Sequence, residues 1–185
     1  MGRFAQLEYK SLVFITYKIS WFSRRKLLKF IRNDEKGIPI NRENNIITKQ
    51  NFYTEYDQEF VDLFKECFFD DFKRHSLKEF GFNLKLRRVW YQVYNDINTT
   101  HGFHTHPSKN ISTPRTSNII YLELNDHDMI TEFIDTNGDI VKPNVKQGDV
   151  LSFNPMIKHR SPPSSKDKSR KTVISFNCDI LVPTY

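Results

Sequence analysis

Three histidines lie close together near the middle of the chain, in the segment WYQVYNDINTTHGFHTH from Trp90 to His106. His104 and His106 are separated by one residue, and in a β-strand this spacing puts both side chains on one face of the sheet. Two imidazoles on one face can bind a single metal ion. A third imidazole, His159, follows the distant segment GDVLSFNP. We therefore predict a metal site formed by His104, His106 and His159.

A metal ion held by three protein ligands on one side keeps coordination positions open on the other side. Iron(II) oxygenases need this arrangement, usually with two histidines and one carboxylate, because a bidentate co-substrate and dioxygen must also bind. Three histidines also suit zinc with an open water position, as in a hydrolase or lyase. The residues alone therefore predict a metal centre that is open to small molecules.

His101 belongs to the same stretch but has a different spacing. It precedes His104 by three positions, and an odd spacing places two side chains on opposite faces of a regular strand. We therefore expect His101 at the rim of the site or behind the ligands, and not on the metal.

Short strands are the elements that would position these residues. Apolar and β-branched runs bounded by Asn, Asp, Gly and Pro predict strands at Lys85–Tyr94, Ser117–Leu124, Ile130–Ile134, Asp149–Asn154 and Thr172–Ile180. Short strands after a helical region predict an α+β fold with a double-stranded β-helix, or jelly-roll, core. Such a core brings distant strands together at one open end, so His104 and His159 can meet there.

A long amphipathic helix is predicted before these strands, at Tyr53–Phe80. Its apolar stripe recurs every four residues and consists of Phe60, Phe64, Phe68 and Phe72. Thr54 is the expected N-cap, and Gly81 is the expected C-terminal stop. We expect this stripe to pack against the core.

The remaining N-terminal elements are shorter. We predict a strand at Ser11–Ile19, a basic amphipathic helix at Trp21–Ile31 and one edge strand near Ile46–Ile47. We expect a single domain over residues 1–185, in which residues 1–82 support a core formed by residues 83–185.

The charge of the chain is basic. It carries 28 Lys and Arg against 22 Asp and Glu, a formal net charge of +6. Short basic clusters lie at Arg24–Lys29, Lys85–Arg88, Lys158–Arg160 and Lys166–Lys171. Such a field attracts nucleic acid or acidic partners, but short, scattered clusters are also typical of a solvated surface.

The cysteines and the apolar runs bear on location. Two cysteines, Cys67 and Cys178, are too few for a disulfide framework. We expect both to be small core residues of a protein in a reducing cytoplasm.

The longest apolar run, Leu12–Phe22, is interrupted by Lys18 and is shorter than the roughly 18 residues of a membrane span. We predict neither a membrane segment nor a targeting segment.

Several motifs occur together in the C-terminal half. They are a strand with Tyr91 and Tyr94, HTHP from His104, the apolar run SNIIYLEL, GDVLSFNP followed by His159, and a basic residue before ISFN. In this combination the chain resembles the iron(II)/2-oxoglutarate-dependent dioxygenases, especially the small prolyl-hydroxylase-like proteins of bacteria and their viruses. The resemblance covers roughly Leu84 to Ile180.

The resemblance implies a hydroxylase that uses iron(II), 2-oxoglutarate and dioxygen. A protein or peptide is then the expected partner, with a peptidyl side chain such as proline as the target. The basic surface leaves nucleic acid as an alternative partner. A cytoplasmic location in a bacterial cell, with the gene carried by the cell or by a phage, is also implied.

In this family a basic residue on the last core strand binds the distal carboxylate of 2-oxoglutarate, since a buried carboxylate needs a fixed counter-charge. Arg170 and Lys171 compete for this role. If Ser175 and Asn177 point inward, strand alternation favours Lys171. The guanidinium of Arg170 can bind a carboxylate through two hydrogen bonds, and for this reason we slightly prefer Arg170. Tyr94 is the expected hydroxyl donor to the same carboxylate.

Further residues are expected around the site. Ser175 is expected to contact 2-oxoglutarate. The residues expected behind the ligands or beside the substrate are His101, Trp90, Asn177 and Tyr121. The loops Ser108–Thr116 and Ser161–Ser169 flank the expected mouth and are candidate lids.

The departure from the family lies at His106, where most members carry Asp or Glu. A neutral imidazole leaves the site one charge unit more positive, which changes metal affinity and the energetics of oxidation. A carboxylate from Asp96, Glu123 or Asp126 could complete the site, or three histidines could suffice, as in some cupin dioxygenases. A cupin-like three-histidine metalloenzyme, or a non-enzymatic basic protein that binds a metal, therefore stays open.

Overall fold

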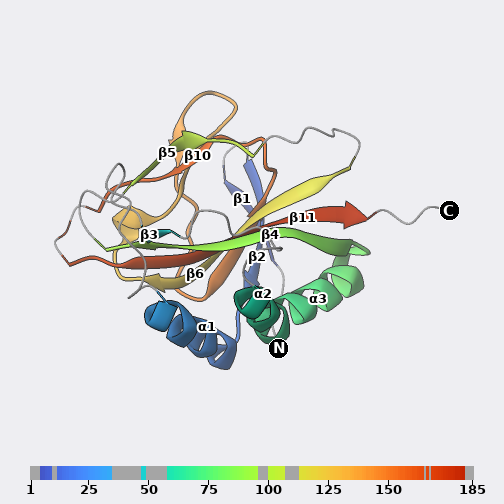
Figure 1. Cartoon of the computed structure of the whole chain (residues 1–185). Helices are drawn as coiled ribbons and strands as arrows, with labels where there is room; N and C mark the ends of the chain where they lie inside the picture. The colour runs from blue at the N-terminus through green and yellow to red at the C-terminus, as the bar shows by residue number, and fades with distance from the viewer. Residues whose placement is uncertain are drawn as a thin grey trace.

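Two antiparallel β-sheets lie face to face, and helices cover the outer face of the larger sheet (Figure 1). The computed structural model describes residues 5–9, 12–34, 47–48, 58–95, 100–106, 113–164, 166 and 168–181. The larger sheet has seven strands, in the spatial order β1 (Ala5–Tyr9), β2 (Leu12–Lys18), β9 (Asp149–Phe153), β6 (Arg115–Leu124), β11 (Lys171–Leu181), β4 (Asn83–Tyr94) and β3 (Ile47–Thr48). The smaller sheet has four, in the order β5 (His101–His104), β10 (His159–Ser161), β7 (Glu132–Ile134) and β8 (Ile140–Val141).

The helical layer precedes most of the strands in the chain. It consists of α1 (Trp21–Asp34), α2 (Gln58–Phe64), a π-helical turn (Lys65–Phe69) and α3 (Asp70–Phe80), and a 3-10 turn follows β6 at His127–Met129. Gly81 ends α3 in the left-handed conformation with φ 71°, and its N–H donates to the Leu77 carbonyl oxygen at 3.0 Å. The predicted stop at Gly81 is therefore confirmed.

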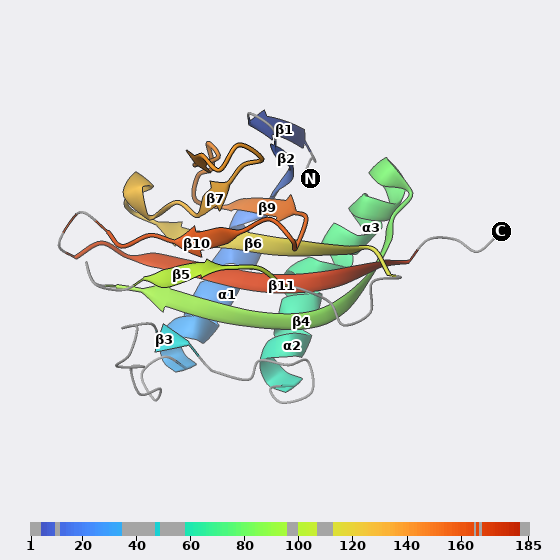
Figure 2. The ribbon, with the colours of Figure 1, turned by 90° about the horizontal axis from the view of Figure 1, so that it is seen from above.

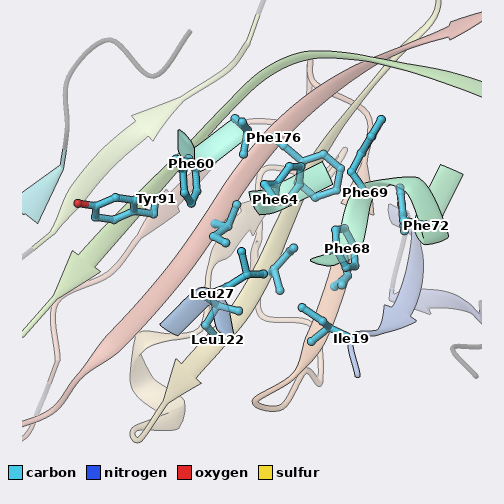
Figure 3. Packing of buried hydrophobic residues seen from close by; sticks show 14 of the residues in the cluster. Ile19, Leu27, Phe60, Phe64, Phe68, Phe69, Phe72, Tyr91, Leu122 and Phe176 are labelled. Atoms are coloured by element: carbon cyan, nitrogen blue, oxygen red, sulfur yellow. The ribbon is translucent and has the colours of Figure 1, made fainter. Parts of the chain in front are cut away.

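Phenylalanine side chains pack the helices onto the larger sheet (Figure 3). The predicted stripe is buried over its whole length, and Phe69 is buried with it. The ring of Phe176 on β11 lies among these side chains, with its centroid 5.3 Å from that of Phe64 and 5.6 Å from that of Phe72. The π-helical turn differs from the regular helix that the sequence predicted. Its extra residue per turn allows the adjacent Phe68 and Phe69 both to reach the core.

Strand β11 contributes to both faces of the larger sheet, between β4 and β6 (Figure 2). Ile174 and Phe176 belong to the apolar core under the helices. Lys171, Val173 and Ser175 alternate with them and line a cavity between the two sheets. The alternation of this one strand therefore separates the packing face from the cavity face.

The observed elements largely follow the predicted ones. The five predicted core strands are β4, β6, β7, β9 and β11, with slightly shifted ends, and α1 extends beyond its predicted end to Asp34. Strands β1, β8 and β10 had no predicted counterpart. Strands β8 and β10 are too short to show a periodic pattern. The predicted cap Thr54 lies outside the described residues. No helix in the described part of the chain is long and apolar enough to cross a membrane.

Candidate metal and co-substrate site

His104, His106 and His159 come together at one end of the smaller sheet. His104 ends β5 and His159 begins β10, and the two residues are direct partners in the antiparallel pairing of these strands. One potential ligand nitrogen from each of the three histidines lies within 4.8 Å of the other two. This spacing is compatible with coordination of one metal ion by three imidazoles.

Backbone contacts orient two of these rings. The Nδ1 atom of His104 lies 2.8 Å from the Gly102 carbonyl oxygen, and the Nδ1 atom of His159 lies 2.9 Å from the Ile157 carbonyl oxygen. A carbonyl oxygen only accepts, so each Nδ1 carries the proton and donates it. The Nε2 atom of each ring is left with the lone pair that a metal requires.

Burial keeps the imidazoles neutral. Desolvation, assisted by the neighbouring histidines, lowers the pKa of His106 to about 4. Desolvation also lowers the pKa of His159 to about 3. Both rings are therefore unprotonated at neutral pH, which is the form that coordinates a metal ion.

His106 lies two residues after the end of β5, the strand that carries His104. Strand β5 ends at His104, and the His106 N–H donates to the Pro155 carbonyl oxygen at 2.9 Å. The expectation that one regular strand presents both side chains is therefore wrong in detail. The backbone contact with Pro155 holds the His106 ring 5.9 Å, centroid to centroid, from the ring of Trp90.

His101 lies on the cavity side, and the prediction that it faces the other way is wrong. Its ring stacks on that of His104 with a centroid distance of 4.1 Å, and it lines the cavity. The pairing of β5 with β10 is irregular, because His104 opposes His159 while His101 opposes Ser161. Three steps on one strand thus match two on the other, and this bulge cancels the expected alternation.

The cavity between the sheets is lined mostly by polar side chains. It encloses about 450 Å³ of empty space, including its open mouth. Its lining comprises Trp90, Gln92, Tyr94, His101, His104, His106, Ser117, Asn118, Ile119, Thr131, Phe153, His159, Arg160, Ser161, Lys171, Val173, Ser175 and Asn177. Among the described residues, no carboxylate lines this cavity, so the potential metal ligands in it are imidazoles.

Lys171 is a fully buried cation in the same cavity. Its side chain is 1% exposed, and its Nζ atom donates to Ser161 Oγ at 2.8 Å and to Thr131 Oγ1 at 3.4 Å. The ammonium also lies 5.0 Å from the centre of the Tyr94 ring. Desolvation lowers the pKa of Lys171 to about 7. Hydroxyl groups and an aromatic face therefore surround an ammonium that has no carboxylate among its described hydrogen-bond partners.

Arg170 lies outside the cavity, and the slight preference for it as the co-substrate anchor is corrected. Its Nε atom donates to Glu123 Oε2 at 2.9 Å on the helix side of the larger sheet. Alternation along the chain explains the difference, because neighbouring residues point to opposite faces and Lys171 already points inward. The fork geometry of the guanidinium is therefore used on Glu123.

The other predicted site residues divide between the wall and the layer behind it. Tyr94, Ser175, Asn177 and Trp90 line the cavity. Tyr121 lies behind the wall, where its hydroxyl donates to Thr131 Oγ1 at 2.9 Å. Burial raises the pKa of Tyr94 and that of Tyr121, so both hydroxyls stay protonated and able to donate.

None of the described candidate carboxylates completes the metal site. Glu123 accepts from Thr172 Oγ1 at 2.7 Å and forms ion pairs with Arg32 and Arg170, all away from the histidines. Asp126 accepts from Ser164 Oγ at 2.9 Å. The positions of Glu123 and Asp126 therefore exclude both as ligands that complete the metal site. Asp96 lies outside the described residues.

The two predicted lids have different outcomes. Most of the first, Ser108–Thr116, lies outside the described residues. In the second, Ser161–Ser169, the hydroxyls of Ser164 and Ser169 donate to buried Asp126, at 2.9 and 3.3 Å. These contacts tie the described part of that loop to the body of the protein.

Among the cavity residues that the sequence did not indicate are the two hydrogen-bond partners of Lys171, Thr131 and Ser161. Ser161 follows His159 by two positions, so strand alternation could have placed both on one face. Thr131 carried no such signal, because its position depends on the pairing of β7 with β10. These hydroxyls became visible only through their contacts with Lys171.

Solved structures share this fold at low sequence identity. A prolyl hydroxylase from Trichoplax adhaerens, in complex with a hypoxia inducible factor peptide fragment, is 13% identical with a TM-score of 0.63, over 90% of this chain and 83% of that chain. HygX from Streptomyces hygroscopicus, with nickel and 2-oxoglutarate bound, is 11% identical with a TM-score of 0.67, over 95% and 84%. SnoK, a non-heme α-ketoglutarate-dependent carbocyclase from nogalamycin biosynthesis, is 12% identical with a TM-score of 0.68, over 92% and 81%.

Sequence comparison adds no closer relative. No protein-family model matches the chain, and no curated protein sequence is significantly similar. The structural likeness nevertheless shows the fold: the chain has the fold of 2-oxoglutarate-dependent oxygenases, including prolyl hydroxylases. These neighbours catalyse different reactions, so the reaction must be argued from the residues of the cavity.

Proposed function

We propose that this chain is an iron(II)/2-oxoglutarate-dependent dioxygenase with a jelly-roll core, which hydroxylates a peptidyl side chain, with proline as the first candidate. The observation that carries this proposal is the presence of Lys171, a buried ammonium, in the same cavity as three clustered imidazoles. A small dianion with one end on a metal and the other end on a cation fits this arrangement. 2-Oxoglutarate has that chemistry.

The donor set fits a divalent metal ion. Burial lowers the pKa of His106 and that of His159, so both are neutral at pH 7. Backbone hydrogen bonds fix the Nε2 lone pairs of His104 and His159. When bound, iron(II) would supply the dioxygen chemistry that inserts oxygen into a C–H bond. His104, His106 and His159 would hold it from one side and leave the opposite side open.

The protein residues would bind and orient the co-substrate. Lys171 is placed to pair with its distal carboxylate, and Ser161 and Thr131 already hold the ammonium in position. Tyr94 keeps its hydroxyl proton and supplies a further donor. A charge-assisted contact of this kind is strong because the surroundings exclude water.

The wall nearest the open face would receive the substrate. Trp90, Ser117 and Asn177 line the cavity, and the Ser117 hydroxyl donates to Asn177 Oδ1 at 3.0 Å. An aromatic face beside amide and hydroxyl groups suits a peptide, which presents apolar rings and backbone amides together. The peptide-bound prolyl hydroxylase among the neighbours is consistent with this choice.

A three-histidine hydrolytic zinc enzyme is the second candidate. The observation that favours it is the all-imidazole donor set, since iron(II) oxygenases normally include one carboxylate. Lys171 disfavours it, because activation of a metal-bound water needs no buried ammonium deeper in the cavity. We therefore rank the oxygenase first.

The decisive test is the charge-transfer absorption of the anaerobic protein with iron(II) and 2-oxoglutarate, followed by succinate release under air. We expect both signals, and we expect neither when succinate replaces 2-oxoglutarate. Hydrolysis of ester substrates by the zinc form, without any charge-transfer band in the iron form, would favour the second candidate. Absence of the band at saturating 2-oxoglutarate would reject the oxygenase proposal.

We also propose a reducing location such as the cytoplasm. Cys67 and Cys178 are both free thiols, and Cys178 is buried in the apolar core. Burial raises the pKa of the Cys178 thiol, which keeps it protonated and unreactive. This supports a structural role for both cysteines rather than a disulfide.

A further inference from the structure

A second hollow lies on helix α1. Figure 1 shows α1 on the opposite side of the larger sheet from β5 and β10, the strands that carry His104 and His159. We call this hollow the α1 groove. It has about 1690 Å³ of empty space, including its open mouth, and is lined by Trp21, Phe22, Arg25, Lys26, Leu28, Lys29, Arg32, Asn33 and Arg170. All of its described lining except Arg170 comes from one helix. The metal-site hypothesis uses none of these residues.

Two large aromatic side chains are exposed at one end of the groove. Trp21 is 53% exposed and Phe22 is 79% exposed. Their rings meet edge to face with a centroid distance of 5.0 Å, and the guanidinium of Arg25 lies 4.6 Å from the centre of the Trp21 ring. Neighbouring aromatic rings that remain in water give no packing energy to the fold, so a binding role accounts for them better.

Positive charge surrounds these rings. The groove carries five cations, of which Lys26 pairs with Glu66 at 2.8 Å, while Arg32 and Arg170 share Glu123. Among the described residues, these five cations outnumber the two carboxylates that pair with them, so this part of the groove is net positive. Within the described part of the chain, no carboxylate forms an ion pair with Arg25 or Lys29. Their charges are therefore available to an anionic ligand.

The spacing of these groups follows the helix. Phe22, Arg25, Lys29 and Arg32 recur at three- and four-residue intervals, which places them along one face. At 1.5 Å per residue the stripe is about 15 Å long. A stacked single strand advances about 3.4 Å per nucleotide, so roughly four nucleotides match this length.

The buried apolar face of α1 and the exposed aromatic rings distinguish between polyanions. A helix that binds a bilayer inserts its apolar face into the membrane, whereas the apolar face of α1, formed by Leu27, Leu28 and Ile31, is already buried in the core. An acidic peptide would use the cations, but its Asp and Glu side chains carry no ring to stack on Trp21 and Phe22. Nucleic-acid bases stack on aromatic side chains while the phosphates pair with Lys and Arg. Single-stranded nucleic acid is therefore the occupant that uses both kinds of side chain.

We propose that the α1 groove binds single-stranded nucleic acid, with bases on Trp21 and Phe22 and phosphates on Arg25 and Lys29. This binding is independent of the oxygenase proposal, because it requires neither iron nor 2-oxoglutarate. It places a nucleic-acid exosite on the opposite side of the larger sheet from the metal. Its function would be to localise the protein rather than to supply the reacting group.

The test is fluorescence anisotropy of a labelled 12-nucleotide single strand with the metal-free protein. Replacing Trp21 by Ala should weaken binding about tenfold or more, and Phe22→Ala should act in the same direction. Phe82, which is 40% exposed and lies outside the groove, supplies the matched control Phe82→Ala, which should leave the affinity unchanged. Thermal unfolding of each variant checks that the fold is retained.

Salt dependence tests the charged part of the groove. The Arg25→Ala/Lys29→Ala pair should reduce the slope of log affinity against log salt by about 1.4, at about 0.7 per single-strand phosphate contact. Lys78→Ala, an exposed lysine on α3, should leave the slope unchanged. Equal or tighter binding to polyglutamate or phosphatidylserine vesicles would overturn the proposal in favour of an acidic protein or a membrane. Strand affinity that is indifferent to both Trp21 and Phe22 would overturn it as well.

Discussion

The two faces of the larger sheet differ sharply in what they bury. Toward the helices, β4 and β11 present Val89, Tyr91, Ile174 and Phe176, which are fully buried in an apolar core. Toward the smaller sheet, the same strands present tyrosine, glutamine, serine and the ammonium of Lys171. One face therefore supplies packing energy, while the other buries polar groups that oppose folding unless each finds a partner.

This difference teaches how a small chain can tolerate a polar cavity between its sheets. Aromatic packing under the helices stabilises the strands that carry the cavity groups, so the cavity need not contribute stability itself. Replacements on the helix face should act on unfolding, and replacements on the cavity face should act on ligand binding. The predictions below test that division.

The largest effect is expected for His104→Ala. Loss of one of three ligands should weaken iron(II) or cobalt(II) binding at least about a thousandfold, while the free energy of unfolding of the metal-free protein changes by less than about 1 kcal/mol. Competition with a coloured chelator measures the affinity. His101→Ala is the matched control, with an expected loss of less than about tenfold. Equal losses at both positions would mean that His101 is a ligand.

On the helix face, Phe176→Ala should lower the free energy of unfolding by about 3–5 kcal/mol, because it empties the centre of the aromatic cluster. Urea denaturation measures the change. The exposed Phe82 gives the control Phe82→Ala, which should stay within about 0.5 kcal/mol. Metal affinity of the folded fraction should not change, and a large change would break the division between the faces.

Lys171→Met should affect stability and binding in opposite directions. The affinity for 2-oxoglutarate should fall at least about a hundredfold, while the free energy of unfolding rises by on the order of 2–4 kcal/mol at pH 6, because a buried charge is removed. The folded-state pKa of about 7 lies below the ordinary lysine pKa of 10.5, so the unfolded chain binds more protons between these values. Wild-type stability should rise with pH across this window, and the advantage of the variant should shrink. A constant difference across that range would contradict this assignment.

The affinity of the wild-type protein for 2-oxoglutarate should decrease as the pH rises above about 7, since only the protonated form of Lys171 attracts the carboxylate. The decrease should be at most about tenfold per pH unit. Titration of the anaerobic charge-transfer band at several pH values measures it. Lys171→Arg keeps the charge at every accessible pH, so whatever affinity it retains should not vary in this way.

The smallest effect is expected for Arg170→Gln. Its guanidinium pairs with Glu123 outside the cavity, so the affinity for 2-oxoglutarate should change by less than about threefold and the free energy of unfolding by about 1 kcal/mol or less. A loss comparable to that of Lys171→Met would show that Arg170 binds the co-substrate. Binding titrations of the two variants under the same conditions make this comparison direct.

Local periodicity in the sequence was sufficient to predict many of the helices and strands. The four-residue spacing of Phe60, Phe64, Phe68 and Phe72 predicted a helical face that packs on the core, although not the π-helical turn within it. That turn depends on Phe69 also finding space against Phe176, which is a tertiary contact. The short strand β10 was missed for a similar reason, since only its pairing with β5 and β7 makes it a strand.

For the candidate site, residue type was more informative than spacing. His104, His106 and His159 were selected by their chemistry, and the fold brings them together. The spacing argument failed at His101, because a bulge between β5 and β10 turns its ring toward the cavity. Alternation did place Lys171 correctly, but the preference for a guanidinium outweighed it.

Three imidazoles, two adjacent cations and the strands that carry them follow from residue types and local periodicity. Which cation faces the imidazoles, and that no described carboxylate joins them, depends on the folded arrangement of the strands. Those outcomes depend on strand register, and a shift of one residue would exchange Arg170 and Lys171 between the two faces. Register is set by packing across the whole sheet, which no local stretch of sequence encodes.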